Sequence, residues 1–377
     1  MAVVRGSQPR MAEMFFYSHF KKIGIDFIGD KRTGWVVDKK IPKNINYIDL
    51  KLKPKWGIDP ITGILGPSHA HRSWQVLEGL EENLKAVDAI NISDTFYFYC
   101  GQSAELAKKL GKKLVVVTWE TIPHHPSTYL PPYSFNVEKV IDNADLFIAR
   151  SQKAREYLLS IGADPAKIKV IYKGIHIQDF MPKIRKPDGK IRLLYVGQLV
   201  ESKGLSKLLD AFTKLSKEFN NLELWICARS AGEPLEEKIK KLAKNYAINW
   251  LGNVSYDEIP SVYQQCDIYC QLSQDWKYFG LLPGGNEWFS YSIMEAMASG
   301  LPVVATGVGG IPEEIGNDNI MVEQKSVESA YSGIKDLILN PAKIEEIGRK
   351  NVLRAKRLFD MEVQAEKTEN AIMEILK

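Results

Sequence analysis

The chain has 377 residues, of which 45% are hydrophobic and 25% charged, and its formal net charge is +4 at pH 7. This composition is ordinary for a soluble globular protein and excludes a disordered or fibrous chain. The length exceeds what one hydrophobic core usually supports, so it predicts two domains with a cleft between them. The basic excess is too small for a dedicated nucleic-acid binder, which leaves an anionic substrate or a membrane surface as partners.

The first residues lack the charged start and apolar stretch of a signal peptide, and no apolar run reaches the roughly 20 residues that span a bilayer. We therefore expect a cytoplasmic protein that at most contacts the inner membrane face peripherally. The cysteines show no Cys-x-x-Cys spacing and are predicted to be small buried apolar side chains: Cys100, Cys227, Cys266 and Cys270.

Short β-branched runs alternate with longer amphipathic stretches along the whole chain. This pattern predicts strand–helix–strand units, and therefore an α/β fold class with parallel sheets. In such sheets, ligands bind outside the carboxyl ends of the strands. The predicted strands cover residues 2–5, 26–28, 114–118, 146–149, 169–172, 191–196, 222–227, 268–272 and 302–306.

A segment rich in proline, glycine and charge, residues 180–190, precedes a fresh strand and marks a hinge near residue 185. The predicted domains are therefore residues 1–184 and 185–358. The last segment, residues 359–377, carries apolar residues at helical spacing, so it needs a surface to cover.

Residues 284–300 are predicted to form a loop followed by a helix. Ser292 can cap this helix, and Gly300 can end it in a left-handed conformation. Backbone N–H groups around Ser290, Tyr291 and Ser292 would then form a phosphate site at the N-terminus of the helix.

Two glutamates accompany this helix start. Glu295 is predicted in the first turn, where the helix dipole favours a carboxylate that can also accept hydrogen bonds from a ribose diol. Glu287 lies in the loop before it, on the side of a sugar attached to the phosphate. Each also fits a purely structural explanation, because a glutamate in a first turn is common capping chemistry and a loop glutamate is usually solvated.

Two further segments also place a loop before a helix. Residues 193–209 form a predicted strand, a glycine turn and a helix that carries Lys203 at its start, and residues 302–315 form another strand, glycine-rich loop and helix. Together with residues 284–300, they resemble the retaining glycosyltransferases of family four, which have the two-Rossmann-domain architecture known as GT-B.

The resemblance rests on several motifs in combination. In that family, two glutamates separated by seven residues form the donor motif, which Glu287 and Glu295 match. Further matches are residues 197–204 for the phosphate loop, 250–254 for the strand end near the base and 171–175 before the linker. The resemblance covers most of the chain but is poor over the first 110 residues.

The resemblance implies two Rossmann-like domains that face each other across a cleft, an N-terminal domain for the acceptor and a C-terminal domain for the nucleotide sugar. It also implies that the last helix crosses back to the N-terminal domain. Lys203 would bind the diphosphate, Glu287 the sugar hydroxyls and Glu295 the ribose. The backbone at Gly6 would approach the donor closely, although an ordinary turn glycine explains that position equally well.

The residues with implied catalytic roles are Glu287, Lys203 and Glu120. The residues with implied donor contacts are Gly6, Gly197, Gln198, Lys203, Val254, Glu287, Phe289, Ser290, Tyr291, Ser292 and Glu295.

The chain departs from the family pattern at two positions. The family's arginine that accompanies the lysine is replaced here by Gln198, which donates a hydrogen bond but carries no charge. The strand over residues 114–118 is followed by Glu120 where the family often has a histidine. Glu120 could contact the acceptor or the donor sugar, or could cap a local turn.

The histidine pairs His69/His71 and His124/His125 lack the additional Cys, Asp or Glu at ligand spacing that a zinc site requires. The chain also contains no Asp-x-Asp, the metal-holding signature of the other major glycosyltransferase fold. We therefore expect no metal and no other cofactor.

The resemblance thus implies transfer of a hexose from a UDP-, GDP- or ADP-sugar to a glycan or lipid-linked sugar, without metal and with retention, which gives an α-linkage. No nucleic-acid partner is expected. Two alternatives stay open: a GT-B sugar-nucleotide epimerase that needs no acceptor, and a non-catalytic nucleotide-sugar binding subunit, which Gln198 suggests. An aromatic segment could stack on sugar or lipid, or fill a hydrophobic gap, through Trp276, Tyr278 and Phe279.

Overall fold

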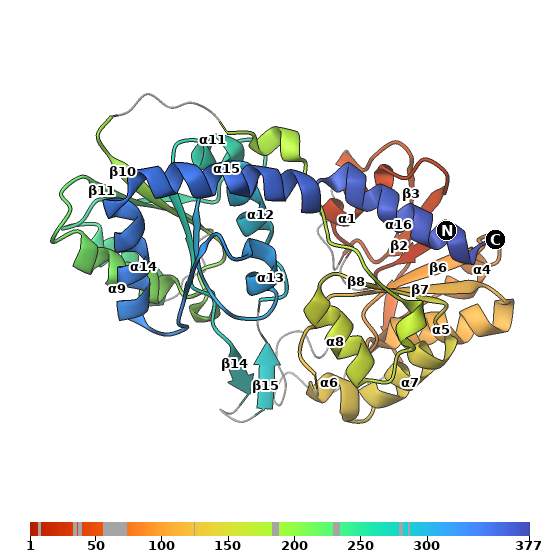
Figure 1. Ribbon diagram of the computed structural model, residues 1–377. Helices are drawn as coiled ribbons and strands as arrows, with labels where there is room; N and C mark the ends of the chain where they lie inside the picture. The colour runs from red at the N-terminus through yellow and green to blue at the C-terminus, as the bar shows by residue number, and fades with distance from the viewer. Residues whose placement is uncertain are drawn as a thin grey trace. The chain divides into compact units, whose positions relative to one another are not determined.

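The chain forms two α/β units in a computed structural model that describes residues 1–6, 9–32, 36, 40–55, 74–123, 125–182, 188–228, 234–278, 282–285 and 287–377 (Figure 1). The first unit consists of Met1–Gly174 and Met361–Lys377, and the second of Ile175–Asp360. No helix among the described residues is long and apolar enough to cross a membrane.

The second unit begins at Ile175, earlier than the boundary expected at residue 185. The Ile175 N–H donates to the Phe359 carbonyl at 2.8 Å, and the Phe180 ring packs edge-on against Tyr263 with centroids 5.7 Å apart. These contacts attach residues 175–180 to the second unit. The predicted hinge at residue 185 lies outside the described residues.

The first unit contains a parallel seven-stranded sheet whose strand order is β3-β2-β1-β6-β7-β8-β9. The order reverses between β1 and β6, and sheets of this kind bind ligands at the carboxyl ends of the strands beside such a reversal. The strands are β1 (Ala2–Val4), β2 (Ile25–Gly29), β3 (Ile45–Asp49), β6 (Ala89–Ser93), β7 (Lys113–Thr118), β8 (Leu146–Ala149) and β9 (Ile168–Val170), and a separate hairpin pairs β4 (Leu52–Pro54) with β5 (Gln75–Leu77).

Both faces of this sheet are buried, as the alternation along β7 shows. Leu114 and Val116 join the core on one face, and Val115 and Val117 join the core on the other. In the sequence, a strand that is buried on both faces is a continuous apolar run, and for this reason the sequence predicts it. The helices of the unit are α1 (Met11–Ser18), α4 (Leu80–Leu84), α5 (Phe98–Leu110), α6 (Pro126–Tyr129), α7 (Tyr133–Asn143), α8 (Gln152–Ser160) and α16 (Met361–Ile375).

The C-terminal helix α16 covers one face of the first unit, beside α1 (Figure 1). Ala365 and Ile372 are fully buried in that core, and the Glu369 carboxylate accepts the N–H groups of Lys22 and Ile23 at 2.6 and 2.9 Å. The expectation that the last helix packs on the N-terminal domain is therefore confirmed.

The second unit contains a parallel six-stranded sheet whose strand order is β12-β11-β10-β13-β16-β17. Here the order reverses between β10 and β13. The strands are β10 (Ile191–Val196), β11 (Leu222–Cys227), β12 (Ile248–Gly252), β13 (Ile268–Gln271), β16 (Val303–Thr306) and β17 (Ile320–Val322), and an antiparallel hairpin pairs β14 (Trp276–Tyr278) with β15 (Leu282–Gly285).

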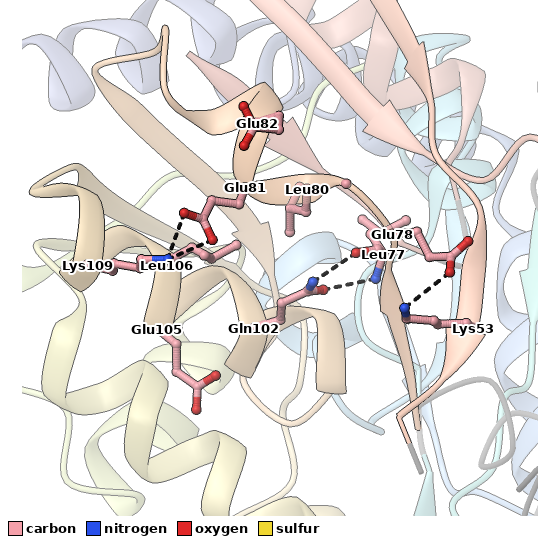
Figure 2. Close-up of a pocket in the computed structure, with 11 residues that line it drawn as sticks. Lys53, Leu77, Glu78, Leu80, Glu81, Glu82, Gln102, Glu105, Leu106 and Lys109 are labelled. Carbon is pink, nitrogen blue, oxygen red and sulfur yellow. Dashed lines mark hydrogen bonds and ion pairs between the residues drawn. The ribbon is translucent and has the colours of Figure 1, made fainter. Parts of the chain in front are cut away.

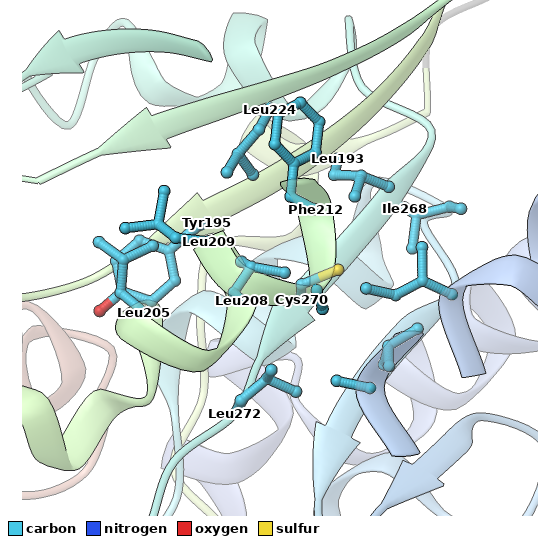
Figure 3. Packing of buried hydrophobic residues seen from close by; sticks show 14 of the residues in the cluster. Leu193, Tyr195, Leu205, Leu208, Leu209, Phe212, Leu224, Ile268, Cys270 and Leu272 are labelled. Atoms are coloured by element: carbon cyan, nitrogen blue, oxygen red, sulfur yellow. The ribbon is translucent and has the colours of Figure 1, made fainter. Parts of the chain in front are cut away.

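A large core lies on one face of this second sheet. Figure 3 shows Leu208 and Phe212 of α9 (Leu205–Leu215) packed against Leu193 of β10 and Cys270 of β13, all of them buried. All four cysteines of the chain are buried, as predicted, and none forms a disulfide. The helical segments are η3 (Ile177–Phe180), η4 (Glu201–Lys203), α9 (Leu205–Leu215), α10 (Pro234–Leu242), α11 (Ile259–Tyr263), α12 (Tyr291–Ala298), α13 (Ile311–Ile315), α14 (Val327–Leu339) and α15 (Pro341–Leu358).

Candidate active site

Lys203 lies in the turn that follows β10, at the point where the strand order of the second unit reverses. The turn is held against the end of β13, because the Gln274 N–H donates to the Ser202 carbonyl at 2.8 Å. Gly204, with φ +73°, ends the turn, and a Cβ on it would stand 1.7 Å from the Leu272 carbonyl oxygen. Only a glycine permits this approach.

Glu287 comes from the loop before α12 and meets Lys203 directly. Its Oε2 lies 2.5 Å from Lys203 Nζ and accepts further hydrogen bonds from Gln271 Nε2 at 3.0 Å and Ser273 Oγ at 3.1 Å. The Glu287 carbonyl accepts the Gly310 N–H at 2.9 Å, which ties the loop to the glycine-rich turn after β16. Two residues predicted as partners in one site are thus brought together.

The start of α12 differs from the prediction in detail. The helix begins at Tyr291 with Ser290 as its N-cap, so Ser292 does not cap it and Glu295 lies in the second turn. Ser290 makes no capping bond, because its hydroxyl bonds to Gln271 Oε1 at 2.9 Å instead. The expected end is confirmed, since Gly300 has φ +78° after the last turn.

The Ser290 N–H is engaged within the protein, contrary to its predicted role as a phosphate ligand. Glu314 of α13 accepts it at 2.9 Å, and both residues are buried. The carboxylate compensates the positive end of the helix dipole from the side. The predicted phosphate site therefore rests on the following N–H groups, at Tyr291 and Ser292.

Glu295 lies on α12 and is 7% exposed. Its Oε2 accepts the hydroxyl of Tyr263 at 2.9 Å, and burial raises the pKa of that tyrosine well above its usual value, with the Glu295 charge as the next contribution. The carboxylate is thus oriented by α11.

The remaining predicted donor contacts of the second unit are more dispersed. Gln198 is exposed, and its carbonyl accepts the Tyr195 hydroxyl at 2.7 Å, while a Cβ at Gly197 would stand 3.1 Å from that same hydroxyl. Val254 is half-buried in the loop after β12. Phe289 is buried against Phe359, so its ring is part of the core rather than a ligand surface.

Gly6 and Glu120 belong to the first unit and follow β1 and β7. Gly6 has φ +46°, and a Cβ there would stand 2.3 Å from the Tyr99 ring, which by itself explains the glycine. Glu120 is buried, and its Oε1 accepts the N–H groups of Thr121 and Ile122 at 2.8 and 2.9 Å. The local turn that the sequence allowed for Glu120 is therefore present.

Asp94 is a buried carboxyl group that the predicted site residues do not include. It follows β6, where the strand order of the first unit reverses, with the left-handed φ of +61°, and its Oδ1 accepts the N–H of Trp119 at 2.9 Å. Burial raises the pKa of Asp94 to about 7, and the charge of Glu120 adds to the rise. Burial also raises the pKa of Glu120. An acid directly after a short apolar run was the only available sequence signal.

Asp94→Asn should make the stability of the protein depend less on pH between about pH 4 and 7. The native pKa lies above the unfolded value of roughly 4, so between about pH 4 and 7 the unfolded chain loses a proton that the native Asp94 retains, and the free energy of unfolding falls as pH rises. The asparagine cannot ionise and tolerates a left-handed backbone. Relative to wild type, the variant should gain on the order of 3 kcal/mol between pH 4 and pH 8.

Urea unfolding across this pH range measures the difference, with Asp88→Asn as the control because Asp88 is exposed on the same unit. Curves of wild type and Asp94→Asn that stay parallel would show that the pKa of Asp94 is the same in the native and unfolded states.

Figure 2 shows a cavity of about 520 Å³ on the first unit, between the β4–β5 hairpin and α5. Both lysines that line the cavity are paired with lining glutamates: Lys109 with Glu81 at 2.7 Å and Lys53 with Glu78 at 3.1 Å. None of its lining residues belongs to the predicted site.

The part of the chain that the structure describes contains no group of three or more His, Cys, Asp or Glu side chains that could hold a metal. His69, His71 and His124 lie outside it. Trp276 is 39% exposed and lies over its own hairpin, where a Cβ on Gly284 would stand 2.4 Å from the indole. The predicted aromatic surface is otherwise undescribed, since Phe279 and the side chain of Tyr278 also lie outside.

Solved structures share this architecture over the whole chain. Anabaena HepE in complex with UDP has a TM-score of 0.75 at 18% identity, covering 99% of this chain and 100% of that one. A glycosyltransferase from Rickettsia africae has a TM-score of 0.75 at 19% identity, covering 100% and 98%. The fold is therefore GT-B, as expected.

Sequence comparison then identifies the family. The profile of "Glycosyl transferases group 1" matches residues 176–352, and that of "Glycosyltransferase Family 4" matches residues 49–179. The chain belongs to glycosyltransferase family 4.

The similarity to curated relatives covers only part of each protein. An uncharacterized glycosyltransferase of Methanocaldococcus jannaschii is 30% identical over 220 residues, 55% of this chain and 53% of that protein. The sulfoquinovosyl transferase of Arabidopsis thaliana is 25% identical over 260 residues, 62% of this chain and 47% of that protein. The chain thus spans about half the length of these relatives.

Proposed function

We propose that the protein is a metal-independent, retaining hexosyltransferase that moves a sugar from a nucleoside diphosphate to a glycan or lipid-linked acceptor. The observation that carries this proposal is the convergence of Lys203, Glu287 and the start of α12 where the strand order of the second unit reverses. A cation, a carboxylate and helix N–H groups are the groups that a sugar diphosphate requires.

Each group has one role in the proposed donor site. Lys203 and the N–H groups at the start of α12 bind the diphosphate, Glu287 accepts hydrogen bonds from sugar hydroxyls, and Glu295 accepts them from the ribose. Anabaena HepE has been solved with UDP and with UDP-glucose, so uridine is the first base to test.

The acceptor is assigned to the first unit. Asp94 and Glu120 lie at the carboxyl ends of β6 and β7, where two buried carboxyl groups suit the hydroxyls of an acceptor sugar. In the reaction, the bond between the anomeric carbon and the phosphate oxygen breaks, and a bond from that carbon to the acceptor oxygen forms. The acceptor proton leaves with the nucleoside diphosphate.

Thermal unfolding with UDP-, GDP- and ADP-glucose tests the donor site. A ligand at about 100 times its dissociation constant stabilises the native state by about 2.7 kcal/mol, so one of the three should raise the melting temperature while free glucose should not. Proton NMR of the first-formed product with a glycan acceptor extract should show an α-anomer.

Three results would change the proposal. A β-linked product from an α-linked donor would exclude retention. Release of nucleoside diphosphate without any acceptor would favour the epimerase, and binding without turnover would favour a non-catalytic subunit.

A further inference from the structure

Gln271 is a buried amide at the carboxyl end of β13, with 2% of its surface exposed. Its Nε2 donates to Glu287 Oε2 at 3.0 Å and to Ser273 Oγ at 3.2 Å, so both amide protons are used. An ionised carboxylate only accepts hydrogen bonds, and this fixes the amide nitrogen toward Glu287. The flipped amide would set two acceptors against each other.

The carbonyl side of the same amide is anchored at the start of α12. Gln271 Oε1 accepts the hydroxyls of Ser290 at 2.9 Å, Ser292 at 3.2 Å and Tyr269 at 2.9 Å. Those hydroxyls also lie within hydrogen-bond distance of one another, with Tyr269 2.7 Å from Ser292 and the two serines 2.9 Å apart, so their three protons are shared among these contacts. The contacts among Tyr269, Ser290 and Ser292 therefore persist when the Gln271 amide is removed.

The amide restricts how Glu287 can meet a ligand. Oε2 of Glu287 receives donors from Lys203, Gln271 and Ser273. The described residues donate no hydrogen bond to Oε1. One carboxylate oxygen is thus occupied by the protein, and the other is left for hydroxyl groups of a ligand.

We infer that Gln271 is a positioning residue that holds the Glu287 carboxylate, through its amide anchored on α12, in the orientation that recognises the donor sugar. This role rests on the proposed sugar contact of Glu287. It predicts that Gln271 affects recognition of the sugar and not of the nucleoside diphosphate.

Two substitutions separate the hydrogen bond from the packing. Gln271→Met keeps the length of the side chain and removes the donor. Gln271→Glu is nearly isosteric and donates to Glu287 only when it is protonated, so its effect depends on pH. The charged and titratable groups around this position are Lys203 on η4, Tyr195 on β10, Tyr269 on β13, Glu287 in the loop, Glu295 on α12 and Glu314 on α13.

The measurement is calorimetry of UDP against UDP-glucose, GDP against GDP-mannose and ADP against ADP-glucose. For the pair that binds, Gln271→Met should lower the ratio of sugar-nucleotide affinity to nucleoside diphosphate affinity by about 10- to 100-fold, the range for a hydrogen bond to a charged group. The affinity for the nucleoside diphosphate itself should stay within about threefold, which also shows that the variant is folded.

Gln271→Glu should lower the ratio at pH 8 and recover most of it at pH 5.5, each compared with wild type at the same pH. Gln265→Glu is the matched control, because that amide is exposed and donates only to the Ser261 carbonyl among the described residues. An unchanged ratio in Gln271→Met, with no pH dependence in Gln271→Glu, would overturn the role of Gln271 alone. Wild type that binds none of the three pairs would overturn the proposed function and this role with it.

Discussion

Replacing Lys203 with alanine is expected to lower kcat by about 100- to 1,000-fold, the usual loss when a group aimed at developing charge is removed. Breaking the bond between sugar and phosphate leaves a diphosphate with additional negative charge. Lys203 supplies a full positive charge there, whereas the start of α12 supplies only partial charge. At the position where the family has an arginine, Gln198 supplies none.

Steady-state kinetics with excess EDTA measure this effect, with Lys207→Ala as the control because that lysine lies nearby, in the first turn of α9. Wild type should stay active in EDTA. Complete loss of activity that magnesium or manganese restores would show that a metal cation neutralises the leaving group.

Gln198→Arg should tighten diphosphate binding without raising kcat if product release limits turnover.

Gly204→Ala should destabilise the second unit by at least about 3 kcal/mol. The left-handed backbone alone costs an alanine about 1–2 kcal/mol. In addition, the new Cβ would stand 1.7 Å from the Leu272 carbonyl oxygen, which belongs to the backbone and cannot rotate away. The turn that carries Lys203 must then separate from the end of β13.

Gly252→Ala is the matched control for this substitution. Gly252 lies in the same unit with φ +71°, and a Cβ there would have nothing within 4 Å. Urea unfolding should give only the backbone cost for this control. Equal costs at both positions would mean that the contact with Leu272 relaxes freely.

The strands that could be predicted contain a run of four apolar residues, at 146–149, 193–196 and 224–227. Residues 146–149, 191–196 and 222–227 match β8, β10 and β11 at both ends. β6, by contrast, is the sequence Ala-Ile-Asn-Ile-Ser, in which a buried asparagine interrupts the apolar pattern. The Asn91 side chain is there to accept a hydrogen bond from the buried Arg5 at 2.9 Å, a partner 86 residues away. No local pattern can reveal that compensation.

The candidate site likewise contains residues that the sequence predicted and residues that it did not. Lys203 and Glu287 were predictable because each stands next to a glycine-rich turn in a recognisable order of strands and helices. Gln271 and Asp94 were not, since their importance comes from neighbours that only the folded sheets bring together. The error at the start of α12 has a similar origin, because Ser290 is drawn from capping by the amide of β13.

The placement of α16 has a consequence for synthesis on the ribosome. The first unit is complete only when residues 361–377 have been made, whereas the second unit is one continuous segment, Ile175–Asp360. At about 5–20 residues per second, translation of that segment occupies roughly 10–40 s. During this interval, the apolar sheet face that later receives Ala365 and Ile372 is uncovered on the nascent chain. The second unit can therefore finish folding first, whereas the first unit completes its core only after the last helix emerges.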